Sequence, residues 1–194
     1  MRTLTYFVAT SVDGFIGAPD GDGEFFNRMV DREYARWLAA EYPETIPTHV
    51  HAQLGLGADT PARHFDTVIM GRGTYDVGLK DGVTSPYGHL EQYVVSRSLA
   101  GSPDPAVQLI SGDVVARVRE LKQRPGLGIW LCGGADLAAQ LVDEIDAFVV
   151  KTYPVLLGTG MPMSRAGFAL RGLELTRVES FPGGQTVSAY ARRR

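Results

Sequence analysis

The most informative segment of the chain is Thr67-Val68-Ile69-Met70-Gly71-Arg72-Gly73-Thr74-Tyr75. Its apolar and β-branched start predicts a buried strand, and the glycines after it predict a turn that opens a short helix. Glycines let the main chain approach an anion closely, and free N–H groups at a helix start bind phosphate. Arg72 adds a fixed positive charge there, and Thr74 adds a hydroxyl. This strand end therefore predicts a phosphate site, with a plain tight turn as the alternative.

Two further strand ends carry the same kind of signal. Residues 128–132 predict a strand, and Gly133-Gly134 predicts the start of a helix that reaches Val142. The strand expected at 92–95 runs into Ser96-Arg97-Ser98, whose hydroxyls and guanidinium suit a phosphomonoester. The glycine pair lacks the third glycine of the G-x-G-x-x-G fingerprint, and the chain has no G-x-x-x-x-G-K-[ST] motif. A Rossmann fold is therefore a poor match, and a P-loop is excluded.

The remaining elements predict an α/β sheet. We expect further strands at 4–9, 107–110, 147–152, 173–181 and 185–191, and helices at 24–41 and 113–122, the second capped by Ser111 or Asp113. The turn Pro182-Gly183-Gly184 predicts that the last two strands form an antiparallel hairpin. Because strands that alternate with helices form parallel sheets, the sheet should start parallel and end antiparallel. Residues 43–65 predict a long loop with room for one short helix.

Composition and charge exclude several classes of protein. The 194 residues include 19 Lys and Arg against 22 Asp and Glu, and the net charge of −3 does not suit a non-specific nucleic-acid binder. The single cysteine, Cys132, can form neither an intrachain disulfide nor a cysteine zinc cluster. The sequence contains no apolar run long enough to cross a bilayer, and its start lacks the features of a signal peptide. We expect a single domain over residues 1–194 in a reducing, cytoplasmic setting, with no membrane or nucleic-acid partner.

Five segments resemble, in order, the dihydrofolate reductase-like superfamily. Within it, the chain is most similar to the reductase domain of the bifunctional riboflavin-biosynthesis deaminase–reductase. The segments are Ser11-Val12-Asp13-Gly14-Phe15-Ile16-Gly17, Val68-Ile69-Met70-Gly71-Arg72-Gly73-Thr74-Tyr75, Val94-Val95-Ser96-Arg97-Ser98, Leu131-Cys132-Gly133-Gly134-Ala135-Asp136-Leu137 and Tyr153-Pro154-Val155-Leu156-Leu157-Gly158-Thr159-Gly160-Met161-Pro162. The resemblance implies a three-layer α/β fold with a mixed, mostly parallel sheet and a C-terminal antiparallel hairpin.

The resemblance also implies NADPH as the cofactor and a homodimer as the assembly. It assigns the cofactor phosphates to Gly71, Arg72, Gly73 and Thr74. It assigns the adenosine 2′-phosphate to Ser96 and Arg97. It assigns the pyrophosphate to Gly133, Gly134, Ala135, Asp136 and Leu137, and the nicotinamide side to Ala9, Ile16 and Gly17.

The substrate side offers two candidate catalytic carboxylates. Folate reductases hold the pterin ring with a carboxylate on the first helix, and Asp31 is the nearest match by position. Its alternative is a solvated helix residue. Asp13, at the exit of the first strand, is the other candidate to orient or protonate the substrate. Folate reductases also carry a Pro-Trp pair where this chain has Gly23-Glu24-Phe25-Phe26, which argues against a folate reductase proper.

The leading hypothesis is an NADPH-dependent reductase of a small nitrogen heterocycle. The substrate would be a pyrimidinone like the precursors of riboflavin, or a pterin-like compound. A dihydrofolate reductase proper and a nucleotide-binding protein without turnover are the alternatives. We expect no metal site, because His49, His51 and His64 lack a ligand spacing and predict loop surface.

Overall fold

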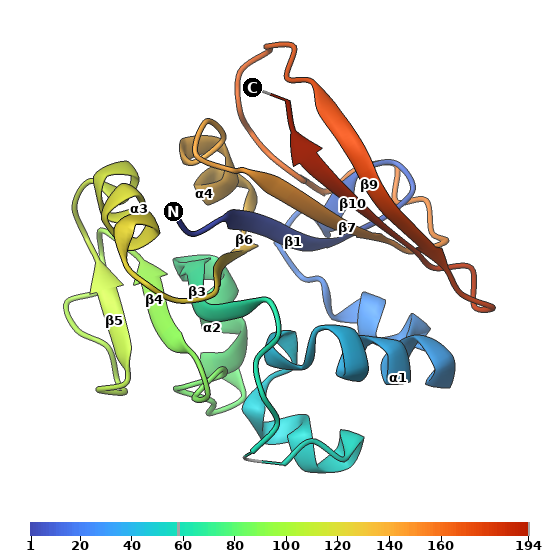
Figure 1. The fold of residues 1–194 in the computed structure, drawn as a ribbon, viewed down its shortest axis with the longest axis horizontal. Helices are drawn as coiled ribbons and strands as arrows, with labels where there is room; N and C mark the ends of the chain where they lie inside the picture. The colour runs from blue at the N-terminus through green and yellow to red at the C-terminus, as the bar shows by residue number, and fades with distance from the viewer. Residues whose placement is uncertain (58, 194) are drawn as a thin grey trace.

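The apolar segments pair into one main sheet, in which six neighbouring strands run in the same direction. In the computed structural model, which describes residues 1–57 and 59–193, the strand order is β5-β4-β3-β6-β1-β7-β10-β9 (Figure 1). Neighbours from β5 to β7 are parallel, whereas β10 is antiparallel to both β7 and β9. The strands are β1 (Leu4–Thr10), β3 (Phe65–Gly71), β4 (Glu91–Val95), β5 (Val107–Ile110), β6 (Gly128–Gly133), β7 (Ala147–Thr152), β9 (Leu173–Ser180) and β10 (Thr186–Arg192). The predicted change from parallel to antiparallel pairing is confirmed.

Helices cover both faces of this sheet and make a three-layer molecule. They are α1 (Arg32–Glu41), α2 (Arg72–Lys80), α3 (Val114–Gln123) and α4 (Ala135–Gln140). On one face, apolar residues of α3 and α4 pack against Leu4, Tyr6 and Leu131. On the other face, Tyr34 of α1 and Tyr75 of α2 join a cluster that is rich in aromatic rings. Figure 1 shows α3 and α4 on the opposite side of the sheet from α1.

The helix predicted over 24–41 is wrong, because the chain breaks in its middle. A 3-10 helix, η1 (Glu24–Met29), comes first, and α1 begins only at Arg32. Val30 is extended, and Asp31 caps α1 by accepting a hydrogen bond from the Tyr34 N–H at 2.8 Å. An aspartate in this position competes with a continuous helix by binding the main chain of the next turn. Apolar spacing alone does not detect such a break.

The segment at 43–65 is held in place by one buried carboxylate. It contains two 3-10 helices, η2 (Pro43–Thr45) and η3 (Thr48–Leu54), where the sequence left room for one. Glu44 is buried, and its carboxylate oxygens accept hydrogen bonds from the N–H groups of Arg63, His64 and Phe65. This contact ties the segment to the start of β3.

The other element boundaries lie close to the predicted ones. Asp113 is the observed cap of α3 and accepts from the Ala116 N–H at 3.0 Å. Helix α4 is shorter than the predicted 133–142 and covers Ala135–Gln140. A two-stranded antiparallel sheet joins β2 (Phe15–Gly17) to β8 (Met161–Pro162), two strands too short to predict from the sequence.

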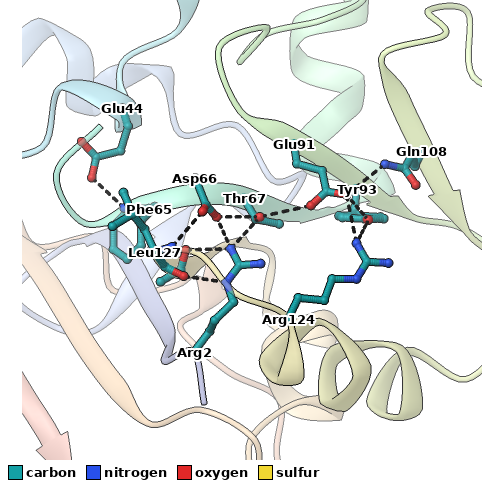
Figure 2. Close-up of polar contacts among 11 residues, drawn as sticks. Arg2, Glu44, Phe65, Asp66, Thr67, Glu91, Tyr93, Gln108, Arg124 and Leu127 are labelled. Carbon is teal, nitrogen blue, oxygen red and sulfur yellow. Dashed lines mark hydrogen bonds and ion pairs between the residues drawn. The ribbon is translucent and has the colours of Figure 1, made fainter. Parts of the chain in front are cut away.

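The amino edge of the parallel strands is closed by a network of ion pairs and hydrogen bonds (Figure 2). The guanidinium of Arg2, just before β1, binds the Asp66 carboxylate, and it donates to the Thr67 hydroxyl at 2.7 Å. Glu91, at the start of β4, accepts from the Tyr93 hydroxyl at 2.5 Å and pairs with Arg124 at 3.2 Å. The charges at this edge therefore neutralise one another.

Over the residues that the structure describes, no helix is both long enough and apolar enough to cross a membrane.

Candidate active site

The four strands whose ends carry the candidate residues lie side by side in the sheet. Strands β4, β3, β6 and β1 are consecutive neighbours and parallel, so their carboxyl ends meet at one edge. The segments that follow them contain the residues expected to hold a cofactor. In open α/β sheets, ligands bind at this edge. The fold therefore brings the predicted anion sites together in one row.

The turns after β3 and β6 touch each other. A Cβ built on Gly71 would lie 3.4 Å from the Gly133 carbonyl oxygen and 3.5 Å from the Gly134 nitrogen. A Cβ on Gly133 would lie 3.8 Å from the Thr74 hydroxyl oxygen, and Gly133 has a φ of +134°, which side chains rarely adopt. The peptide between Gly133 and Gly134 is cis. Glycines at these positions let the two turns and the Thr74 hydroxyl lie close together.

Two helices begin at this place. Helix α2 starts after Gly71 and α4 after Gly134, and in the part of the chain that the structure describes neither start is capped by a side chain. Gly73 is exposed, and a Cβ there would meet no atom within 4 Å among the described residues. The first N–H groups of a helix have no partner within it and favour an anion. Two such starts side by side suit a pyrophosphate.

The two arginines of the predicted site differ in their partners. Arg72 Nε donates to the Asp76 carboxylate one turn along α2, at 2.5 Å. Arg97, after β4, is exposed and has neither an ion pair nor a hydrogen bond to any other described residue. Ser96 beside it is buried, and its hydroxyl oxygen accepts from the Leu99 N–H at 3.0 Å. Arg97 is therefore the arginine at this edge that needs no exchange of partner to bind an anion.

At the start of α4 the side chains are buried or paired with other residues. Ala135 and Leu137 are buried, and Leu137 belongs to the core cluster under α3 and α4. Asp136 is exposed and pairs with Arg165 at 2.9 Å. An anion held by residues 133–137 would therefore have to bind their main chain.

The loop after β1 is fastened by Asp13. Its carboxylate accepts from the Ser11 hydroxyl at 2.6 Å, from the Gly158 N–H at 2.7 Å and from the Leu157 N–H at 3.2 Å. The Ser11 hydroxyl, followed by these two N–H groups, holds the pKa of Asp13 below its ordinary value, so the carboxylate stays ionised at neutral pH. The same loop carries Ile16 and Gly17 into the β2–β8 pair. Asp13 thus binds two segments together and is poorly suited to donate a proton.

Asp31 is also occupied by main-chain donors. One oxygen accepts from the Tyr34 N–H at 2.8 Å, and the other accepts from the Gly183 N–H at 3.0 Å. These bonds join the start of α1 to the turn between β9 and β10. Asp31 is therefore the cap of α1, and not a solvated residue inside the helix.

Lys151, which the sequence did not single out, lies on the face of the sheet that α1 and α2 cover. Lys151 is on β7 and pairs in register with Ala9 of β1. Its Nζ lies 4.3 Å from the centroid of the Phe7 ring. The signal was a lone lysine inside the apolar run 147–152, whereas a buried parallel strand is usually apolar throughout.

A metal site and the two surface hollows are the other places considered for a ligand. Of the residues placed by the structure, no three His, Cys, Asp or Glu side chains gather as metal ligands. The rings of His51 and His89 contact each other at a tilt of 47° with centroids 4.6 Å apart, and His51 Nε2 lies 2.8 Å from the Ile46 carbonyl oxygen. Two shallow hollows of about 310 Å³ each are lined by residues such as Met1, Asp143, Thr3 and Gly128, away from the row of glycine turns.

A mostly parallel sheet with glycine turns at its carboxyl edge and an antiparallel C-terminal pair defines the dihydrofolate reductase-like class of α/β proteins. Solved structures agree with this class. A Shewanella sp. PV-4 protein named for riboflavin biosynthesis superposes with a TM-score of 0.72 at 23% identity, over the whole of both chains. Dihydrofolate reductase from Enterococcus faecalis, in complex with NADP(H), superposes with a TM-score of 0.60 at 13% identity, over 99% of this chain and 97% of that one.

Within this class, the chain belongs to the family of the RibD C-terminal domain, whose family model matches residues 2–187. A Thermotoga maritima diaminohydroxyphosphoribosylaminopyrimidine deaminase/5-amino-6-(5-phosphoribosylamino)uracil reductase shares the fold with a TM-score of 0.61 at 15% identity, over 99% of this chain and 57% of that protein. Two Bacillus subtilis (strain 168) relatives, the uncharacterized proteins YwjB and YyaP, are each 29% identical over 97% of this chain. The match covers 97% and 94% of their lengths.

Proposed function

We propose that this protein is an NADPH-dependent reductase of a small nitrogen heterocycle, in which residues 1–194 form a single domain. The observation that carries the proposal is the contact between the starts of α2 and α4, with the unpaired Arg97 along the same edge. Bound NADPH supplies a hydride. Both faces of the eight-stranded sheet carry a core cluster, which supports one folding unit.

The residues at the edge fit the parts of the cofactor one by one. The N–H groups at Arg72, Gly73 and Thr74 and the main chain at 133–137 would bind the pyrophosphate. Ser96 and Arg97 would bind the 2′-phosphate, because Arg97 offers a guanidinium without a competing carboxylate. Ala9, Ile16 and Gly17 would border the nicotinamide. Arg72 would have to leave Asp76 to contribute its charge.

We propose a positioning role for the two carboxylates. Asp13 holds the loop after β1 against Gly158, and Asp31 holds the start of α1 against Gly183. Each therefore shapes one wall of the expected substrate side. A pyrimidinone like the precursors of riboflavin is the favoured substrate class, and the family of the RibD C-terminal domain supports it.

The cofactor assignment is tested by binding. NADPH and NADH are titrated separately while the fluorescence of Trp37 and Trp130 is followed, in the wild type, in Arg97→Ala and in the control Arg36→Ala, which removes an exposed arginine of α1. We expect NADPH to bind more tightly than NADH, and Arg97→Ala to weaken NADPH about tenfold while leaving NADH and the control unchanged, as for the loss of one charge-assisted contact. Failure of both dinucleotides to bind would overturn the reductase proposal.

We also propose that the protein is a homodimer. Strand β9 is an edge strand whose Leu175 and Val178 are 54% and 53% exposed, and Phe168 and Leu170 before it are fully exposed. An unpaired apolar edge is a template for pairing with another strand. A second copy of the chain would cover it symmetrically.

A further inference from the structure

A chain of hydrogen bonds fastens η2 and η3 to the turn that precedes β4. The Thr48 N–H donates to the Pro86 carbonyl oxygen at 2.8 Å, and the Gly88 N–H donates to the Thr48 hydroxyl oxygen at 2.9 Å. The same hydroxyl lies 3.0 Å from Nδ1 of His89, and Nε2 of His89 lies 2.9 Å from the Glu44 carbonyl oxygen. His89 therefore contacts both 3-10 helices from the turn.

The partners of His89 determine which of its ring nitrogens carries the proton. A carbonyl oxygen can only accept, so Nε2 must carry the hydrogen that it donates to Glu44. In the neutral ring Nδ1 is then an acceptor, and the Thr48 hydroxyl donates to it. The hydroxyl oxygen stays free to accept from the Gly88 N–H. Each donor of this chain therefore has an acceptor when His89 is neutral.

Protonation of His89 conflicts with this arrangement. A charged ring donates from both nitrogens, so Nδ1 would direct a hydrogen at the Thr48 hydroxyl oxygen, which already accepts from Gly88. The proton of the hydroxyl would at the same time lose its acceptor. Burial lowers the pKa of His89 and the nearby His51 lowers it further, against the opposing effect of the carbonyl and the carboxylate of Glu44. The contacts therefore favour the neutral ring.

A second histidine contacts the first. His51, on η3, holds its ring centroid 4.6 Å from that of His89, and its Nε2 donates to the Ile46 carbonyl oxygen at 2.8 Å. Two positive charges at this separation repel each other even at the dielectric constant of water. The pair can therefore hold one proton more easily than two while the rings stay in contact.

The groups around the two rings do not neutralise two charges. Glu44 faces the pair from η2, Thr48 from η3 and Tyr87 from the turn before β4, with 6.4 Å between the ring centroids of Tyr87 and His89. Burial raises the pKa of Tyr87, so this side chain is neutral. Among the described residues, Glu44 is the carboxylate that acts on His89, and its oxygens already accept from three N–H groups at the start of β3.

We propose that His51 and His89 form a pH-sensitive latch, which holds η2 and η3 against the turn before β4 while both rings are neutral and releases them when the rings are protonated. The turn carries Tyr87, whose ring centroid lies 4.8 Å from that of Trp130, on the face of the sheet that α1 and α2 cover. Release would therefore loosen one wall of this face. The latch belongs to the free protein, so it does not depend on the cofactor assignment.

The direction of the pH dependence follows from linkage. A histidine whose pKa is lowered in the closed arrangement binds its proton more readily when that arrangement opens. The latch is therefore strongest above the ordinary histidine pKa of 6.5, and it weakens as the pH falls below this value.

Hydrogen exchange of main-chain amides in the free protein tests the latch. The amides of Thr48 and Gly88 donate across it, and the Ala116 amide, which Asp113 holds at the start of α3, is the reference. Protection is measured relative to an unstructured chain at about pH 7.5 and about pH 5.5, on either side of the ordinary histidine pKa. We expect the protection of Thr48 and Gly88 to fall at least about threefold, which repulsion between the two charges supports, while that of Ala116 is unchanged.

Three variants separate the latch from a general effect of acid. His89→Gln keeps a donor for the Glu44 carbonyl but cannot be charged, so its protection should be the same at both pH values. In His51→Gln the loss of protection should be smaller, and the pKa of His89, measured from its ring-carbon signal, should rise. The control His49→Gln, an exposed residue of η3, should behave as the wild type.

Equal protection of the wild type at both pH values would overturn the latch. So would a loss of protection that persists undiminished in both His51→Gln and His89→Gln, because the titrating group would then lie elsewhere. A failure to bind NADPH would contradict the proposed reductase and would leave these exchange measurements unaffected.

Discussion

Substitution of Asp31 tests whether this carboxylate, which matches the position of the ring-binding carboxylate of folate reductases, is structural or catalytic. Asp31→Ala removes the cap of α1 and the bond to Gly183. We expect the free energy of unfolding to fall by about 0.5–2 kcal/mol, the usual cost of losing an N-cap, while NADPH affinity stays unchanged. Urea denaturation measures the loss, and Asp113→Ala, which uncaps α3, should cost a similar amount. An Asp31→Asn protein with wild-type stability and no turnover would instead identify a catalytic carboxylate.

The pKa of Asp13 predicts a dependence of stability on pH. The Ser11 hydroxyl and the N–H groups of Gly158 and Leu157 hold this pKa below 3.8, its ordinary value. A carboxyl group with a lowered folded-state pKa stabilises the fold above its unfolded-state pKa, and this contribution is lost as the pH falls through the folded-state pKa. The loss should therefore appear below pH 3.8. Urea denaturation at a series of acidic pH values should show a shallower fall in Asp13→Asn than in the wild type, and parallel curves would contradict the prediction.

The positions and the contacts of these residues differ in how far the sequence predicts them. Arg97 and the glycines at 71 and 133–134 follow apolar strands, so local pattern places them at the carboxyl edge. The partners of a side chain are not local. The pairing of Arg72 with Asp76 lies within one helix turn, yet the bond between Asp31 and Gly183 joins residues 152 positions apart. No spacing rule predicts the second kind of contact, so the bond between Asp31 and Gly183 could not be predicted from the sequence.

At the scale of elements, the loop after β1 depends on a close approach to β8. A Cβ on Gly160 would collide with the Gly17 carbonyl oxygen and lie 3.2 Å from the Phe15 Cβ. Gly160→Ala must therefore push β2 and the start of β8 apart. We expect a loss of about 1–3 kcal/mol in stability, as for other overpacked sites, together with weaker NADPH binding. Gly167→Ala is the control, because a Cβ there meets no described atom within 4 Å.

Denaturation and NADPH titration of the two glycine variants decide the outcome. Equal behaviour of Gly160→Ala and Gly167→Ala would show that β2 tolerates displacement and does not border the cofactor. Weaker NADPH binding in Gly160→Ala alone would link the β2–β8 pair to the nicotinamide side.

Helices and strands were predictable where the local pattern of apolar residues and turns determined them. The parallel strands are short, mostly apolar runs bounded by turns, and the turn at 182–184 indicated the antiparallel pair, so the strand positions and the change in pairing followed from the sequence. The break at Val30 and Asp31 did not, because apolar residues continue at helical spacing through η1 and hide the cap. The strands β2 and β8 have three and two residues, and they exist only because the fold brings them together.

At the scale of the whole molecule, the two edges of the parallel sheet have different chemistry. At the amino edge, Arg2 and Arg124 are paired with Asp66 and Glu91, so the charges there are used within the fold (Figure 2). At the carboxyl edge, glycine turns, two helix starts and Arg97 stay available. Donors that are to bind an anion must stay unpaired within the fold, and this lowers stability. The ion pairs at the amino edge hold the strands together, so the donors at the carboxyl edge can stay unpaired.

The assembly proposal predicts the effect of charges on β9. In sedimentation at micromolar concentration the wild type should have about twice the chain mass of 21.0 kDa, and the double variant Leu175→Asp, Val178→Asp should have the mass of one chain. In a dimer with two-fold symmetry, each introduced carboxylate would face its own copy, and the two would repel. The variant would also lose the apolar contact that the leucine and valine make at the exposed edge.

A substitution of the same kind elsewhere separates this effect from a general one. Leu54→Asp replaces an apolar residue of η3 that is 40% exposed, far along the chain from β9, and it should leave the dimer intact. A wild type that sediments as a single chain would contradict the dimer. A double variant that still dimerises would place the interface on another surface, because two buried like charges facing their copies are incompatible with a β9 contact.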